Sequence, residues 1–268
     1  MLLQDGASDI HHENVSANSH RQPDRLRHFP NKVQVRATEI RTDTDFGKAS
    51  FIIDDVKLEE FRKPVFKVCA DKEPFDVKGV SKLMRGQTNL GVSLPCRCLV
   101  EVVNKDHKVF IRKGRNQNAG TAQKEVLLVS EDGSIDPSTP VVFDYEKITS
   151  ITAIPVDEKP ITIKGGTFTT IANQCSSDYV YHARGFTVVR SGTRMEGITH
   201  LITGEGDHGA PYGGFITLSR AADIVVIDCL MTGHKTYVKS KGAAGLPVSM
   251  GTYDLNANSC AHILWKNC

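Results

Sequence analysis

The chain has 268 residues and a formal net charge of +2, with acidic and basic residues interspersed along it, so we expect no nucleic-acid-binding face and no polybasic membrane patch. No apolar run approaches the roughly 20 residues that cross a bilayer, and the first residues lack the basic-then-apolar pattern of a signal peptide. These features predict neither a nucleic acid partner nor membrane insertion.

The N-terminal half begins with a polar leader and continues with short strands. Residues 1–31 hold four histidines among polar residues without periodicity, which predicts a disordered leader. From residue 32, runs rich in Val and Ile alternate with turn signals, and strands are expected at 33–37, 49–55, 65–68, 99–103, 109–112 and 125–129. The last three flank turns at 104–107 and 131–134, as in antiparallel hairpins. Residues 32–155 are therefore predicted to form a β-rich N-terminal cap or subdomain.

A short segment recurs in the C-terminal half. Phe186–Ser191, Ile224–Cys229 and Ile263–Cys268 share one strand-like pattern and start about 38 and 39 residues apart, and Ile161–Gly166 begins the series. A strand that recurs at a fixed distance, with no helical pattern between copies, is typical of stacked coils. With further short strands between the copies, each coil would hold about three strands. Residues 156–268 are predicted to be coils of a right-handed parallel β-helix. An all-β sandwich is the alternative, but it predicts no fixed recurrence.

The chain end and the cysteines complete this interpretation. The last copy stops at Cys268 without a polar closing element, and repeat folds normally need a terminal cap, so we expect this chain to be the N-terminal part of a longer protein. Seven cysteines, an odd number, predict no disulfide framework. The spacing of Cys96 and Cys98 is too tight for a zinc knuckle. Cys229 and Cys268 close equivalent repeats and are expected to stack as small apolar side chains.

Two long loops carry the residues best suited to chemistry. Thr203-Gly204 and Thr232-Gly233 precede the loops 204–214 and 234–247, which should leave one corner of stacked coils about 4.8 Å apart. Paired carboxylates there would suit glycoside hydrolysis, and a Lys or His would suit an eliminative lyase. The candidate catalytic residues are Glu205, Asp207, His208, His234 and Lys235, and the candidate substrate-binding residues are Tyr212, Tyr237, Tyr253 and Asp254. The alternative interpretation is structural, with Asp207 in a turn and the tyrosines packing the loops.

Metal binding receives little support from the sequence. The alternating aspartates of Thr42–Gly47 lack the spaced glutamate and glycine of an EF-hand and are interpreted as a turn. No pair of cysteines or histidines has zinc-ligand spacing on a predicted scaffold. We predict no metal site and no cofactor, with calcium as the alternative.

Three segments carry a family resemblance: Thr42–Asp55, Ile161–Phe168 and Thr203–Tyr212. In them the chain resembles pectate-lyase-like right-handed parallel β-helix proteins, and in particular poorly characterised bacterial secreted or cell-surface members. The resemblance implies that the β-helix starts at Asp45-Phe46-Gly47, that the location is extracellular or on the cell surface, and that the protein trimerises if it is tailspike-like. The polygalacturonase and pectate lyase catalytic motifs are absent, so no catalytic residue is carried over.

These observations lead to two functional hypotheses of different classes. The first is a carbohydrate-active protein that cleaves or binds an extracellular polysaccharide, of glycoside hydrolase or polysaccharide lyase type, with Glu205 and Asp207 as acid and base. The second is a non-catalytic structural or adhesive β-helix, such as a phage tail fibre or a surface glycan-binding module. An inactive fragment is a third interpretation.

Overall fold

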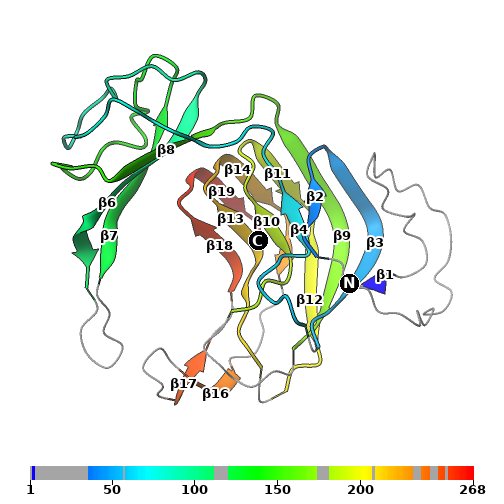
Figure 1. Ribbon diagram of the computed structural model, residues 1–268. Helices are drawn as coiled ribbons and strands as arrows, with labels where there is room; N and C mark the ends of the chain where they lie inside the picture. The colour runs from blue at the N-terminus through cyan, green and yellow to red at the C-terminus, as the bar shows by residue number, and fades with distance from the viewer. Residues whose placement is uncertain are drawn as a thin grey trace.

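The computed structural model describes residues 2–3, 36–56, 58–111, 120–173, 181–206, 209–231, 237–241, 247–250 and 253–268. Every regular element in these ranges is a β-strand, which confirms the all-β prediction (Figure 1). The predicted leader lies outside the described residues, except for β1 (Leu2–Leu3), which pairs antiparallel with β3. Within the same ranges, no helix combines the length and the apolar character needed to cross a bilayer.

Two parallel sheets form the body of the molecule (Figure 1). The short sheet consists of β2 (Thr38–Ile40), β4 (Phe66–Val68), β10 (Phe186–Val188), β13 (Gly213–Ser219) and β18 (Tyr253–Asn258). The long sheet consists of the parallel strands β3 (Thr44–Asp54), β9 (Ile161–Ile171), β11 (Thr193–Glu196), β12 (Thr199–Thr203), β14 (Ala222–Ile227), β15 (Leu230–Met231) and β19 (Ala261–Lys266), with the antiparallel β1 at its edge. In both sheets neighbouring strands follow chain order. The chain therefore passes repeatedly from one sheet to the other and lays each new strand beside an earlier one.

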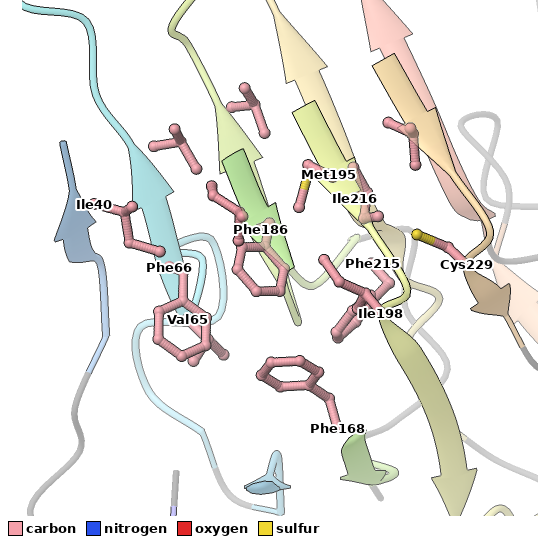
Figure 2. Packing of buried hydrophobic residues seen from close by; sticks show 14 of the residues in the cluster. Ile40, Val65, Phe66, Phe168, Phe186, Met195, Ile198, Phe215, Ile216 and Cys229 are labelled. Atoms are coloured by element: carbon pink, nitrogen blue, oxygen red, sulfur yellow. The ribbon is translucent and has the colours of Figure 1, made fainter. Parts of the chain in front are cut away.

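Alternating side chains explain why these strands stack. In the long sheet, Met195 is the register partner of both Ile163 and Val226, and Val226 also pairs with Trp265. Because parallel register keeps every second side chain on the same face, such columns point toward the other sheet. The space between the sheets is filled by apolar side chains, including packed phenylalanine rings (Figure 2).

The aromatic part of this core is ordered as stacked pairs. The rings of Phe51 and Phe168, which are register partners in the long sheet, lie 4.7 Å apart at 7°. The rings of Phe66 and Phe186, partners in the short sheet, lie 4.8 Å apart at 19°. Figure 2 shows Phe168 and Phe186 approaching each other from the two sheets, and their centroids are 5.4 Å apart. Identical side chains at equivalent register positions thus form a continuous core.

The recurrence seen in the sequence is partly correct. Ile224 and Ile263 are register partners in the long sheet, as predicted. Phe186 is not their equivalent, because it lies in the short sheet and pairs with Ile216. The strand that continues the column toward β9 is β11, where Thr193 pairs with Ile161. Both sheets bury alternate apolar residues, so a five-residue pattern alone does not distinguish between them.

An antiparallel sheet lies to one side of the parallel body (Figure 1). It contains β5 (Phe75–Asp76), β8 (Ser150–Pro155), β6 (Cys98–Phe110) and β7 (Thr121–Val129), in that order. Residues 75–155, called the insert below, have a hydrophobic core of their own that includes Leu83, Val100 and Leu127. The region is antiparallel, as predicted, but the predicted turn at 104–107 is wrong, because these residues lie inside the continuous strand β6, which pairs with β7.

The insert lies between strands of the parallel sheets in the chain. β2, β3 and β4 precede the insert and belong to these sheets, and β3 pairs directly with β9, which follows the insert. The insert therefore interrupts the parallel body after its first strands. More than 100 residues separate Thr44–Asp54 from Ile161–Ile171 in the chain, so no local sequence pattern could predict that these two strands pair. The division into a cap at 32–155 and coils at 156–268 stays a proposal.

Candidate functional site

The two predicted site loops leave neighbouring strands. β12 and β15 pair in parallel, with Thr199 opposite Leu230, so the loops after them start at the same edge of the long sheet. In the second loop, β16 (Tyr237–Lys241) and β17 (Pro247–Met250) form an antiparallel pair. Asp207, His208, His234 and Lys235 lie outside the described residues, and so does the side chain of Tyr237. Glu205 is half-buried just after β12. The predicted catalytic grouping therefore stays a proposal.

The returning half of the first loop packs into the body of the molecule. The buried Asn173 side chain donates to Ala210 O at 2.9 Å and accepts from Ala210 N at 2.8 Å. Its backbone N–H donates to the hydroxyl of Tyr212 at 2.8 Å. The Tyr212 ring is fully buried, with the guanidinium carbon of Arg184 4.4 Å from its centroid. A ring without exposed surface offers no face to a sugar. Tyr212 thus has the packing role of the alternative interpretation.

Tyr253 and Asp254, at the start of β18, differ in exposure. The Tyr253 side chain is 52% exposed, and its ring stacks on that of Tyr181 at 5.7 Å. Asp254 forms an ion pair with the buried Arg184 at 2.8 Å and lies 3.8 Å from Nδ1 of His200. Asp254 therefore anchors an interior cation, whereas Tyr253 presents an aromatic face to the outside, as a sugar-binding residue requires.

A groove of about 500 Å³ lies where the insert meets the long sheet. We call it the insert groove. Its walls come from the insert and the segment leading to β9 on one side, and from β11, β14 and the turn before β11 on the other. The lining residues are Cys96, Arg97, Glu131, Val156, Asp157, Glu158, Pro160, Gly192, Thr193, Arg194, Asp223 and Val225.

Charged groups in the insert groove are held in fixed positions. The Arg97 guanidinium contacts both carboxylate oxygens of Asp223, through Nη1 at Oδ2 and through Nη2 at 3.4 Å from Oδ1. Partial burial raises the pKa of Asp223, but hydrogen bonds from Arg97 and His262 outweigh it and hold the pKa below its usual range. Arg194 donates to Glu196 at 2.8 Å. The groove thus offers oriented donors and acceptors beside the apolar Val156 and Val225.

Asp157 adds a buried acceptor to the same wall. One oxygen accepts from Asp71 N at 2.9 Å and pairs with Arg190 at 3.3 Å. The other oxygen, Oδ2, is buried and has no hydrogen-bond partner among the described residues. A groove of this size with fixed polar groups and some apolar surface suits a polyhydroxylated ligand.

Sequence reasoning missed every residue of this groove. Arg97, Asp157 and Asp223 are separated by long stretches of chain and are brought together only when the insert docks on the long sheet. The one signal that was available is the repeat itself, because Asp223 and His262 follow the register partners Ala222 and Ala261 and occupy equivalent positions.

Metal and thiol chemistry have little structural basis in the described ranges. There, no group of three or more His, Cys, Asp or Glu side chains is arranged to hold a metal ion. Six cysteines in these ranges are free thiols. Burial raises the pKa of Cys98 to about 12, so this thiol is unreactive at neutral pH. Cys229 lies in the core as predicted, but Cys268 is exposed.

Comparisons with known proteins show a likeness of fold to a phage tailspike. No family model and no curated protein matches the chain. The chain is similar to the crystal structure of tailspike gp61 of Pseudomonas phage phi297, with a TM-score of 0.51 and 11% sequence identity over 85% of this chain. The likeness is one of fold. The matched part is 34% of that tailspike, so this chain spans about a third of its length.

Proposed function

We propose that the two parallel sheets are successive coils of a right-handed parallel β-helix and that this chain binds a polysaccharide outside the cell, as a surface or phage tail module would. The observation that carries the proposal is the strict chain order of strands in both sheets, together with a tailspike fold likeness over 85% of the chain. The resemblance of the sequence to pectate-lyase-like proteins agrees with this assignment.

The insert groove is the binding surface that we favour. Its donors and acceptors are fixed by ion pairs, so binding a glycan would not require them to be ordered first. Arg194, on the long sheet, lines the groove, and its Nε donates a hydrogen bond to the Glu196 carboxylate. The exposed Tyr253 ring offers a separate stacking surface.

A glycan array with the purified chain tests this function. We expect binding to bacterial surface polysaccharides and a Kd about 10-fold weaker or more for Arg194→Ala, because a hydrogen bond to a charged group is worth about 1.5–3 kcal/mol. Lys266→Ala is the matched control, since Lys266 is exposed on the same sheet but does not line the groove. No binding to any glycan, or equal weakening by both variants, would contradict the proposal.

Cleavage of the bound glycan is the second candidate activity. It is favoured by the pairing of β12 with β15, which starts both predicted catalytic loops at one edge. A hydrolase releases reducing ends alone, whereas a lyase also produces unsaturated uronates that absorb in the ultraviolet. Glu205→Gln should abolish either signal if Glu205 is the acid or base. Glycan binding without product release would contradict cleavage and would support the non-catalytic glycan-binding module.

A further inference from the structure

Three side chains beside the insert groove are arranged as a hydroxyl, an imidazole and a carboxylate. Ser138 Oγ lies 2.5 Å from His262 Nε2, and His262 Nδ1 lies 3.0 Å from Asp223 Oδ1. This is the order of nucleophile, base and orienting carboxylate in serine acyl transfer, which is recognised by geometry and not by sequence position. We propose that Ser138, His262 and Asp223 form a serine esterase site that removes O-acyl groups from a polysaccharide.

The fold itself brings these residues together. Asp223 and His262 directly follow the register partners Ala222 and Ala261, so they occupy equivalent positions on adjacent strands, about 4.8 Å apart along the stack. Both have positive φ, 56° and 53°, a conformation that non-glycine residues adopt at a cost. Ser138 comes from the insert, in the segment after β7. The set therefore exists only where the insert docks on the long sheet.

Asp223 is equipped to orient and stabilise a charged imidazole. It is held between Arg97 and His262, and these contacts keep it ionised in spite of its partial burial. An ionised carboxylate at Nδ1 selects the tautomer that leaves Nε2 free to accept a proton from Ser138. The same carboxylate then stabilises the imidazolium that forms. Asp223 is thus a positioning residue, and His262 is the general base.

A second carboxylate fixes the serine. Asp136 Oδ1 accepts from the Ser138 backbone N–H at 2.9 Å and from its hydroxyl at 2.6 Å. The single hydroxyl proton is thus within reach of two acceptors, Asp136 and His262 Nε2, and is donated to one of them at a time. The neighbouring turn repeats this arrangement, because Asp132 accepts from the N–H and the hydroxyl of Ser134 at 3.0 and 2.8 Å. Among the described residues, no histidine is bonded to Ser134. The two serines thus differ in their access to an imidazole.

The chemical step uses only these groups, the ester and water. Ser138 Oγ forms a bond to the ester carbonyl carbon while its proton moves to His262 Nε2. The bond from that carbon to the sugar oxygen breaks, and the proton passes from His262 to the leaving hydroxyl. Water, deprotonated by His262, then hydrolyses the acyl-serine to a free carboxylic acid and restores Ser138.

The position of the groove supports the glycan part of this inference. Asp223 lines the insert groove and belongs to the set, and Arg97, its hydrogen-bond partner, lines the same groove, so a polysaccharide in the groove would place its substituents beside Ser138. That part rests on the proposed function. The reactive serine does not, because it can be tested with small esters.

The test uses the full chain with a fluorophosphonate probe, with 4-nitrophenyl acetate and with O-acetylated polysaccharide. We expect covalent labelling of Ser138, located by mass spectrometry, and acetate release from the polysaccharide. Ser138→Ala and His262→Asn should each lower ester hydrolysis about 100-fold or more, as loss of a nucleophile or general base does. Ser134→Ala is the matched control and should retain the activity. Asp223→Asn should lower kcat with KM unchanged, which a purely structural contact would not do.

Several results would overturn the inference. They are an unlabelled Ser138, or equal ester hydrolysis by the Ser138→Ala and Ser134→Ala variants. Labelling of Ser138 without acetate release from any polysaccharide would refute the substrate class. Glycan binding on the array with no reactive serine would refute only this inference, whereas a reactive serine without glycan binding would refute the proposed function.

Discussion

At the scale of single residues, the interior contains charged groups as well as phenyl rings. Asp55 is fully buried, and its Oδ1 accepts a close charge-assisted hydrogen bond from Arg36. Its Oδ2 has no hydrogen-bond partner in the described part of the chain. Burial raises the pKa of Asp55 to about 6, and attraction to Arg36 offsets this only in part. Asp55 should therefore take up a proton on folding in mildly acidic solution.

This pKa predicts how Asp55 changes stability with pH. The folded state binds the proton more tightly than the unfolded chain, so the contribution of Asp55 is greatest below about pH 4 and is lost as the pH rises through about 6. Asp55→Asn, which stays neutral, removes this dependence. Between pH 4 and 7, the unfolding free energy of the wild type should fall by about 2 kcal/mol relative to that of Asp55→Asn, because this range covers most of a pKa shift of about two units. Denaturant titrations at several pH values measure this difference, and parallel curves would contradict it.

Asn173 shows how one amide can shape a loop. Its side chain satisfies both backbone groups of Ala210, which is buried. In Asn173→Ala the N–H and C=O of Ala210 lose their hydrogen-bond partners, and each buried unsatisfied group lowers the free energy of unfolding by about 1–3 kcal/mol. We expect a lower unfolding free energy and faster hydrogen exchange at the Ala210 amide. Unchanged exchange at that amide would mean that Asn173 does not hold the loop.

At the scale of elements, Arg190 links the insert to the parallel sheets. It lies between β10 and β11. Its buried guanidinium pairs with Asp71 at 2.7 Å and with Asp157 at 3.3 Å, and donates to Lys159 O at 3.0 Å. Asp71 precedes the insert and Asp157 follows it. One side chain therefore ties both ends of the insert to the turn before β11.

Removing this tie should loosen the insert. Arg190→Ala leaves the buried Asp157 without its cation, and breaking a buried ion pair from one side costs about 3–5 kcal/mol. We expect a loss of that order in the unfolding free energy, with faster hydrogen exchange near residues 70–72 and 156–160. Lys72→Ala is the control, because its pair with Glu158 is exposed and should contribute little. Equal effects of the two variants would argue against Arg190 as the anchor.

The elements also explain which features the sequence could predict. Strand alternation is local, so the strand segments at 99–103 and 125–129 and the register of Ile224 with Ile263 were predictable, whereas the predicted turn at 104–107 lies inside β6. The sequence pattern around Phe186 could not show which sheet it belongs to, because strands of both sheets bury alternate apolar side chains. The groove residues Arg97 and Asp223 meet through docking of the insert, which depends on contacts between distant segments.

At the scale of the whole molecule, two parallel sheets carry an antiparallel insert, with a groove at their junction. The long sheet forms one wall of the groove, and the insert contributes Cys96, Arg97 and Glu131 to the other wall. This arrangement resembles other sites in which function resides on segments held by a stable scaffold. The predicted loop site and the insert groove lie on different parts of the surface, so one experiment can distinguish them.

Hydrogen exchange with and without a polysaccharide that binds on the array makes that distinction. We expect slower exchange on binding at residues 96–98, 156–160, 192–196 and 222–226, which border the insert groove. Arg194→Ala should remove this protection. Protection confined to the loops 204–214 and 234–247, with the groove segments unchanged, would contradict the proposal that the glycan binds between the insert and the long sheet.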